Sequence, residues 1–309
     1  MKTNRVVVIG STNMDMVVKT KHIPVPGETV LGGAFFMNPG GKGANQAVSI
    51  ARLGGDVIFI SKVGNDVFGR QSIQTFEEEG ININGVFADK NDPSGVALIT
   101  VDELGENSIV VASGANLNLT PEDVENYLKK ISDVSVILIQ LEIPMDTVKY
   151  AAQYAASHGI KVILNPAPAN SLISELFPLI DIITPNSNEA ERLTGIVVKD
   201  IVTAKKAAKS IYNQGVKNVV ITLGAKGAVL MNDEGFRQIP SNKVEAVDTT
   251  AAGDVFNGAL SLAIAEGKDL LSAVHFANQA ASIAVTRMGA QSSIPYRKEL
   301  VLDAITKSK

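Results

Sequence analysis

The chain has 309 residues, 45% of them hydrophobic and 19% charged, which is typical of a folded globular protein with a large buried core. Its net charge is −4, it has no block of basic residues, it lacks Cys, and its three His residues are widely separated. These properties argue against a nucleic-acid partner, a disulfide framework, a thiol nucleophile and a zinc cluster.

The first predicted element is a short apolar strand at residues 5–10, RVVVIG. It stops at a glycine and polar residues follow soon after, so it does not read as a signal peptide. No later apolar run approaches the roughly 20 residues that span a membrane. We therefore expect a cytoplasmic protein that has no membrane partner.

Further short β-branched runs alternate with helix-like segments along the chain. The expected strands are DVIFIS (56–61), SVILIQ (135–140), IKVILN (160–165), DIITPN (181–186) and NVVITLG (218–224). The helix-like segments between and after them cover residues 43–54, 147–159, 203–215 and 255–267. Continuous apolar strands separated by helices are typical of a parallel sheet covered on both faces. The predicted fold class is α/β, with a doubly wound, Rossmann-like parallel sheet.

Two regions, at about 12–38 and 94–113, depart from this alternation. Both carry strand-like runs and turn residues without an apparent helix. We interpret them as a small antiparallel β lid inserted into a single α/β domain of residues 1–309. Such a lid would lie near the C-terminal edge of the parallel strands, where ligands usually bind. Its exposed face is alternatively an oligomer interface.

Polar residues follow two of the buried strands. Asn13 and Asp15 lie two apart in GSTNMD, so on an extended segment they face the same side and could reach the hydroxyls of one ligand. Glu142 follows the strand SVILIQ, and a buried carboxylate there needs a partner. The plainer alternatives are ordinary turn residues for the pair and an exposed loop acid for Glu142.

A glycine-rich segment, NPGGKGANQA, precedes the first predicted helix. Gly41 and its neighbours expose the backbone, while Lys42 and Asn45 can offer hydrogen-bond donors. The segment does not match a Walker A loop, and no strand–turn–helix junction shows the GxGxxG pattern of dinucleotide binding. A turn with a purely structural role is an equally good interpretation.

Two further segments carry candidate nucleotide-site residues. Asn186 and Glu189 lie three apart at a helix start, so they could hold a hydrated Mg²⁺ beside a phosphate, or could simply cap the helix. In ITLGAKGAVLM a Gly-flanked turn joins two strands, and Thr222, Gly224 and Gly227 could approach a nucleotide closely. Any β-turn would also favour those glycines.

The stretch DTTAAGD, residues 248–254, runs directly into a predicted helix. Small residues let a ligand approach the backbone, and the first turn of a helix leaves amide groups without intrahelical partners. The sequence thus predicts an anion pocket with Asp254 beside it. The alternative is that Asp254 is only a favourable residue for a helix start, with Gly253 easing the turn.

Taken together, these segments resemble the ribokinase family of carbohydrate kinases. Both family signatures are present, as GGKGANQAVSIARLG and DTTAAGDVFNGAL, and GSTNMD, TPNSNEAE and TRMGAQSSIP occur in the family's order. The resemblance covers essentially the whole chain and implies the ribokinase-like form of the α/β fold. One difference is Ala251, where the wider family often has Gly. Because a methyl group is small, we expect the anion pocket to be intact.

The resemblance implies an enzyme that phosphorylates D-ribose at O5 with ATP, giving D-ribose 5-phosphate and ADP. Asp254 would be the general base, and the amides of Ala252 and Gly253 would stabilise charge on the transferring phosphoryl group. A related kinase of deoxyribose, fructose or adenosine is the alternative. The paired Asn13 and Asp15 favour a free, hydroxyl-rich sugar. A sugar-binding regulator without catalysis is the other alternative, and the intact Asp254 argues against it.

The same resemblance assigns the remaining site residues. The sugar would be held by Asn13, Asp15, Gly41, Lys42, Asn45, Glu142 and Asp254. The ATP site would be formed by Asn186, Thr222, Gly224, Ala225, Lys226, Gly227, Gly253 and Asn278. Glu189 would act through water on Mg²⁺. A monovalent cation, usually K⁺, would lie at Asp248, Thr250, Ala284, Arg287, Gly289 and Ser293. The family also suggests a homodimer formed through the β lid.

Overall fold

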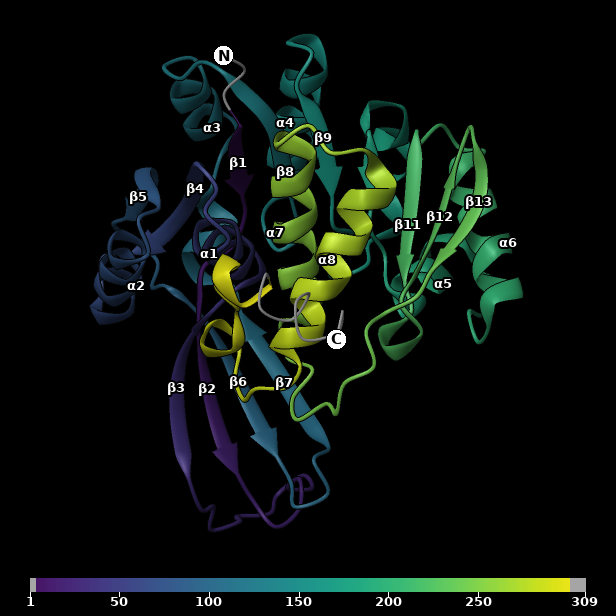
Figure 1. Cartoon of the computed structure of the whole chain (residues 1–309). Helices are drawn as coiled ribbons and strands as arrows, with labels where there is room; N and C mark the ends of the chain where they lie inside the picture. Colours follow the sequence, from purple (N-terminus) through teal and green to yellow (C-terminus); the bar gives the residue numbers. More distant parts are fainter. Residues whose placement is uncertain (1–3, 301–309) are drawn as a thin grey trace.

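The computed structural model describes residues 4–300, apart from the side chains of residues 171 and 172. Residues 1–3 and 301–309 of the expected single domain lie outside this part. One large sheet consists of strands β1 (Arg5–Ile9), β4 (Val57–Gly64), β5 (Asn82–Asp89), β8 (Val134–Ile139), β9 (Lys161–Leu164), β10 (Ile182–Ile183), β11 (Asn218–Thr222), β12 (Ala228–Asn232) and β13 (Gly235–Ile239). Their spatial order is β13-β12-β11-β10-β9-β8-β1-β4-β5 (Figure 1).

The central strands of this sheet are parallel, as their continuous apolar runs predict. Strand β1 pairs in parallel with β4 on one side and β8 on the other, and the parallel pairing continues through β9 and β10 to β11. The edge strands β12 and β13 are antiparallel, because tight turns rather than crossover helices connect them to β11. The expected strand–turn–strand in ITLGAKGAVLM is confirmed.

Helices cover both faces of the sheet. Their bounds are α1 (Lys42–Arg52), α2 (Val67–Glu78), α3 (Pro121–Leu128), α4 (Met145–Ser157), α5 (Ser187–Thr194), α6 (Ile201–Tyr212), α7 (Ala252–Ala265) and α8 (Leu270–Ala284). Successive residues of β1 point to opposite faces, so Val6 and Val8 join one core cluster while Val7 and Ile9 join the other. Within residues 4–300, each helix is too short or too polar to cross a bilayer.

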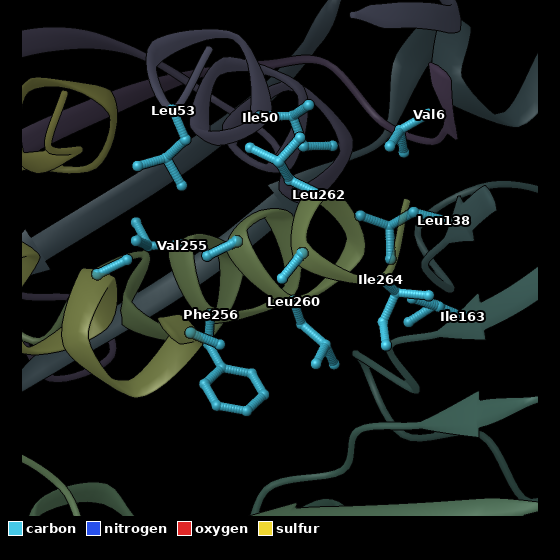
Figure 2. Packing of buried hydrophobic residues seen from close by; sticks show 14 of the residues in the cluster. Val6, Ile50, Leu53, Leu138, Ile163, Val255, Phe256, Leu260, Leu262 and Ile264 are labelled. Atoms are coloured by element: carbon cyan, nitrogen blue, oxygen red, sulfur yellow. The ribbon is translucent and has the colours of Figure 1, made fainter. Parts of the chain in front are cut away.

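Helix α7 lies in the centre of the first core cluster. Its side chains pack between those of the α1 region and those of the central strands, as Figure 2 shows for Leu262 beside Ile50 and for Ile264 beside Ile163. Every residue of α7 from Asp254 to Ala265 is buried. Because both its flanks are packed, the start of α7 is held rigidly at the C-terminal edge of the sheet.

The lid is a separate four-stranded sheet at that edge, formed by β2 (Asn13–Lys19), β3 (Phe35–Gly40), β6 (Gly95–Val101) and β7 (Asn107–Ala112), in the order β3-β2-β6-β7 (Figure 1). Both outer pairs are antiparallel, as expected, but the central β2–β6 pair is parallel. Both strands leave the same edge of the large sheet in the same direction, after β1 and β5. The predicted fold class, an α/β protein with a small β lid, is confirmed.

Candidate active site

Two adjoining cavities lie where the lid meets the C-terminal edge of the large sheet. The larger has a volume of about 590 Å³ and the smaller about 180 Å³. The lid contributes Ala97, Ile99, Ile109 and Val111 to the wall of the larger cavity. This cavity is also lined by all seven residues predicted for sugar binding, Asn13, Asp15, Gly41, Lys42, Asn45, Glu142 and Asp254.

Glycines bring the two polar segments of the larger cavity together. Gly41 adopts a φ of 90°, a conformation that favours glycine, immediately before α1. A Cβ on Gly43 would lie 2.6 Å from backbone atoms of Gly10 and Ser11, so α1 can pack against the end of β1 only with glycine there. Gly43 therefore has the purely structural role that was one interpretation of this segment. Lys42 and Asn45, on the same helix, line the cavity.

Lys42 carries positive charge within the site, and Arg192 adds a second cation to the cavity wall. Its Nζ lies 3.9 Å from Oε1 of Glu142. Burial lowers the pKa of Lys42, but nearby carboxylates outweigh burial and raise it above its usual value. Those carboxylates belong to Asp254, Glu142, Glu189 and Asp15. Lys42 therefore stays protonated, and its charge offsets the repulsion among the four carboxylates of this small site.

Asp15 is an unusually basic carboxylate. Burial is the largest cause, the negative charges of Glu142 and Asp254 add to it, and Lys42 opposes it. Together they raise the pKa of Asp15 from 3.8 to about 6. Asp15 is thus mostly ionised at neutral pH, and it gains a proton under mildly acidic conditions.

Asp254 is buried in the first turn of α7 and borders both cavities. Its Oδ2 accepts a hydrogen bond from Nδ2 of Asn45 at 3.0 Å, and its Oδ1 accepts one from Nε2 of Gln46 at 2.9 Å. Burial raises the pKa of Asp254, and the charge of Lys42 and these two amides only partly offset it. The result is an oriented carboxylate with raised basicity, as a general base requires.

Gln46 is a functional residue that the sequence analysis missed. It is fully buried, its Nε2 also donates to Oδ1 of Asn165 at 3.1 Å, and its Oε1 accepts from Nε2 of Gln140 at 2.6 Å. Gln46 therefore acts on Asp254 as one member of a buried amide chain. The available signal was an amide side chain at an interior position of a small-residue helix, since such a group needs buried partners.

The smaller cavity lies at the N-terminus of α7. The first hydrogen bond of this helix runs from the amide of Val255 to the carbonyl of Ala251, so the amides of Gly253 and Asp254 precede the regular pattern. A Cβ on Gly253 would meet no atom within 4 Å, so this residue faces open space. The amide of Ala252, the other predicted donor, bonds to the Thr249 carbonyl at 3.2 Å. Helix start and open space together fit an anion.

Ala251 occupies the position where the wider family often has Gly. Its φ is 59°, in the left-handed region that costs a non-glycine residue about 1 kcal/mol or more. Ala251 lines both cavities and keeps the backbone turn that starts α7. The positive φ is therefore one physical reason why glycine suits this position.

Asn186 and Glu189 have the capping role that was one of their two expected roles. They form a capping box, in which Oδ1 of Asn186 accepts from the amide of Glu189 and Oε2 of Glu189 accepts from the amide of Asn186, each at 2.8 Å. Both residues also line both cavities. Burial is the main cause that raises the pKa of Glu189. Within residues 4–300, no group of three or more His, Asp or Glu side chains could hold a metal ion directly.

The remaining predicted nucleotide residues lie outside the two cavities, except Thr222 and Gly253, which line the smaller one. Gly224, Ala225 and Lys226 form a short 3-10 turn. Gly227, with a φ of 87°, packs so closely on residues 239–241 that a Cβ would lie 2.1 Å from the Ile239 carbonyl. Asn278 donates to the Pro240 carbonyl at 3.4 Å. Gly227 and Asn278 thus meet at one loop.

The predicted cation residues come from two loops that Asp248 joins. Its Oδ1 accepts from the amide and hydroxyl of Thr250 at 2.9 and 2.6 Å, and its Oδ2 accepts from the amide of Gly289 at 2.8 Å. Burial opposes these bonds, but their net effect lowers the pKa of Asp248. The Ser293 hydroxyl donates to the Ala290 carbonyl at 2.8 Å. The Arg287 amide donates to the Ala284 carbonyl. The Arg287 guanidinium forms an ion pair with Glu299. Asp248 therefore caps the turn at Thr250 and links it to the loop at Gly289.

A buried, oriented carboxylate stands between a cavity lined by polar and charged side chains and a helix start that suits an anion. This arrangement, under a lid at the edge of an α/β sheet, defines a phosphotransferase that acts on a small polyhydroxyl substrate. The model of the pfkB family of carbohydrate kinases matches residues 3–297. The chain belongs to this family, and the predicted family is confirmed.

Individual relatives are similar over nearly the full length. A ribokinase of Haemophilus influenzae is 47% identical over 292 residues, which are 94% of this chain and 95% of that protein. A deoxyribokinase of Salmonella typhi is 38% identical over 94% of this chain and 95% of its own. The structure of an Arabidopsis thaliana ribokinase complexed with ribose and ATP is 32% identical, has a TM-score of 0.90, and covers 97% of this chain and 98% of its own.

Proposed function

We propose that this chain is an ATP-dependent kinase that phosphorylates D-ribose at O5. The observation that carries the proposal is the position of Asp254, which borders both the hydroxyl-binding cavity and the anion-binding cavity. The similarity to ribokinases, at 47% identity for the Haemophilus influenzae protein, supports ribose as the sugar.

In the reaction, the Asp254 carboxylate accepts the proton of the sugar O5 hydroxyl. A bond forms between O5 and the γ-phosphorus of ATP, and the bond from that phosphorus to the bridging oxygen breaks, so that ADP leaves. Asn45 and Gln46 hold the carboxylate in one orientation. The amide of Gly253 faces the developing charge on the phosphoryl oxygens, since donors oriented in advance stabilise the transition state most effectively.

Release of ADP against a panel of pentoses, hexoses and nucleosides tests this function. We expect D-ribose to give the highest kcat/KM, because a site that pairs every hydroxyl leaves its own groups unpaired with a sugar that lacks one. The Salmonella typhi relative makes 2-deoxyribose the second candidate substrate. Equal efficiency on both pentoses would favour that candidate, while binding without any ADP release would favour a regulator.

Mg²⁺ is proposed at Glu189, held through water. The Oε2 of Glu189 is engaged by the Asn186 amide, whereas Oε1 makes no hydrogen bond to another residue within 4–300 and is available to a hydrated ion. When bound, Mg²⁺ neutralises charge on the nucleotide phosphates. The nucleotide itself is proposed to extend from the smaller cavity past Thr222 towards the loop where Gly227 and Asn278 meet.

A prediction concerns sugar binding and pH. Because the pKa of Asp15 is about 6, lowering the pH through 6 protonates it and removes a hydrogen-bond acceptor for the sugar. We expect the affinity for ribose to fall in that range, and Asp15→Asn to abolish most of the dependence. Calorimetric titration with ribose should use the Asp254→Asn protein, in which the base does not titrate. There the midpoint should lie somewhat below 6, because Asp254 contributes to the shift.

A monovalent cation is proposed beside Asp248. A K⁺ ion there would order the loop that carries the start of α7 without touching the sugar, which is electrostatic preorganisation. We expect K⁺ to activate ribose phosphorylation more than Na⁺ does, and Asp248→Asn to weaken that response. KCl is titrated against a large inert cation at fixed ionic strength and saturating Mg·ATP. An unchanged parent rate across the titration would rule out the cation site.

The lid is proposed to join two copies of this chain. The register aligns Met37, Met16, Leu98 and Val110 in one row across the lid, on the face opposite to the cavity-facing row of Ala97 and Val111. Met37, Leu98 and Val110 are each more than half exposed, at 51%, 52% and 64%. Leu98→Lys should therefore shift the sedimentation coefficient from dimer to monomer.

The proposed cytoplasmic location is tested by cell fractionation.

A further inference from the structure

Asn116 connects the lid to the sugar cavity. It lies in the short 3-10 helix Gly114–Asn118, directly after the lid strand β7, and it is 1% exposed. Its Oδ1 accepts from the amide of Thr12 at 2.8 Å, and its Nδ2 donates to the Thr12 carbonyl at 3.0 Å and to Oδ1 of Asn13 at 2.8 Å. No role follows for Asn116 from the sequence motifs.

These contacts determine the orientation of two amide groups. The backbone of Thr12 offers one donor and one acceptor at fixed positions, so only one orientation of the Asn116 amide satisfies both. With its Nδ2 thereby directed at Asn13, the atom of Asn13 that Asn116 meets must be an acceptor, Oδ1. The Asn13 amide is left with Nδ2 as its free end, and Asn13 lines the sugar cavity.

A donor at this position complements the rest of the cavity. Asp15, Glu142 and Asp254 are acceptors when ionised, so they accept hydrogen bonds from the sugar hydroxyls. The oxygen lone pairs of those hydroxyls then need donors. If Asn13 were reversed, its Oδ1 would compete with the carboxylates for the same hydroxyl proton.

The neighbouring strand makes room for these two amides at a glycine. Gly95 of β6 is the register partner of Asn13. A Cβ on Gly95 would lie 2.2 Å from Oδ1 of Asn13 and 2.3 Å from Nδ2 of Asn116. Glycine at this position therefore lets the hydrogen bond between the two amides form directly against the lid backbone.

We propose that Asn116 is a positioning residue for sugar recognition: it holds Asn13 so that Nδ2 donates to a hydroxyl oxygen of the substrate. This inference rests on the proposed function, in which the larger cavity holds the sugar. Asn116 also lines this cavity, but its amide is engaged by Thr12 and Asn13, so it acts through Asn13, and its loss should impair sugar binding and leave nucleotide binding unaffected.

The test is a double-mutant cycle with Asn116→Asp and Asn13→Ala. A carboxylate at position 116 can still accept from the Thr12 amide but cannot donate to Asn13, so the Asn13 amide reverses. We expect Asn116→Asp to lower kcat/KM for ribose by about tenfold or more, mainly through KM, with KM for ATP unchanged. In the Asn13→Ala background the same change should have an effect of less than about threefold.

The matched control is Asn118→Asp in the same short helix. Asn118 donates to the carboxylates of Asp89 and Asp92 and forms no hydrogen bond to Asn13 in the described part of the chain, so this change should lower the melting temperature and leave the KM for ribose unchanged. If Asn116→Asp does not fold, Asn116→Ala removes the same donor and replaces it in the cycle. Additive effects in the cycle, or an equal rise in both KM values, would overturn the role of Asn116. A parent protein that turns over no sugar would instead overturn the proposed function.

Discussion

Replacing Asp254 by Asn should lower turnover of ribose by about 10²–10⁴-fold, the usual contribution of a general base. The change keeps the size of the side chain and removes the proton acceptor. It also leaves only one oxygen where Asn45 and Gln46 both donate, so one of these amides loses its partner. The turnover rate is measured as ADP release in a discontinuous assay at saturating ribose and ATP.

The affinity for both substrates separates loss of the base from loss of the site. Calorimetry of the Asp254→Asn protein should give dissociation constants for ribose and ATP within about tenfold of the parent values. Asp269→Asn is the matched control, because it makes the same charge change at the N-cap of α8, where Asn caps equally well. Turnover near the parent level in Asp254→Asn would refute the assignment of the base.

Replacing Gln46 by Glu should lower turnover at neutral pH by about 10²-fold. The substitution removes a donor that lies 2.9 Å from Oδ1 of Asp254 and places a second carboxylate at that position. Two buried carboxylates in contact cannot both ionise readily, so the pKa of the base rises further. The pH profile of kcat should therefore move to higher pH, with part of the lost rate recovered there.

The pH profile distinguishes this effect from simple destabilisation. Gln279→Glu is the control: Gln279 lies on α8 and donates to the Leu300 carbonyl at 2.7 Å, so its replacement breaks a comparable bond away from Asp254. It should reduce the melting temperature without moving the profile. If Gln46→Glu lowers turnover at every pH by the same factor, Gln46 has only a structural role.

The two missed residues, Gln46 and Asn116, share one property. Gln46 bonds to a residue 208 positions away, and Asn116 to one 103 positions away. Hydrogen bonds between such distant segments leave no periodic or local signal. By contrast, Asn13 and Asp15 lie two apart on one strand, so their common face could be predicted from strand geometry alone.

The charge state of the site was equally hidden. The pKa of Asp15 depends on burial and on Glu142, Asp254 and Lys42, which three different segments bring together. The parallel pairing of β2 with β6 is a further case, because it depends on the direction in which two distant strands leave the large sheet. A strand pattern shows that a segment is extended, but not which neighbour it pairs with.

The sequence by itself determined the α/β class, the lid segments and the family, and the resemblance to that family assigned the seven sugar-site residues, all of which line the larger cavity. The class and the lid follow from properties of short segments: continuous apolar strands need cover on both faces, and Gly41 permits the turn before α1. Only the tertiary structure decided which amide orients Asp254, which one orients Asn13, and how strongly the acids perturb one another. Hydrogen-bond direction and electrostatic energy depend on distances of a few ångströms between segments, and folding alone sets those distances.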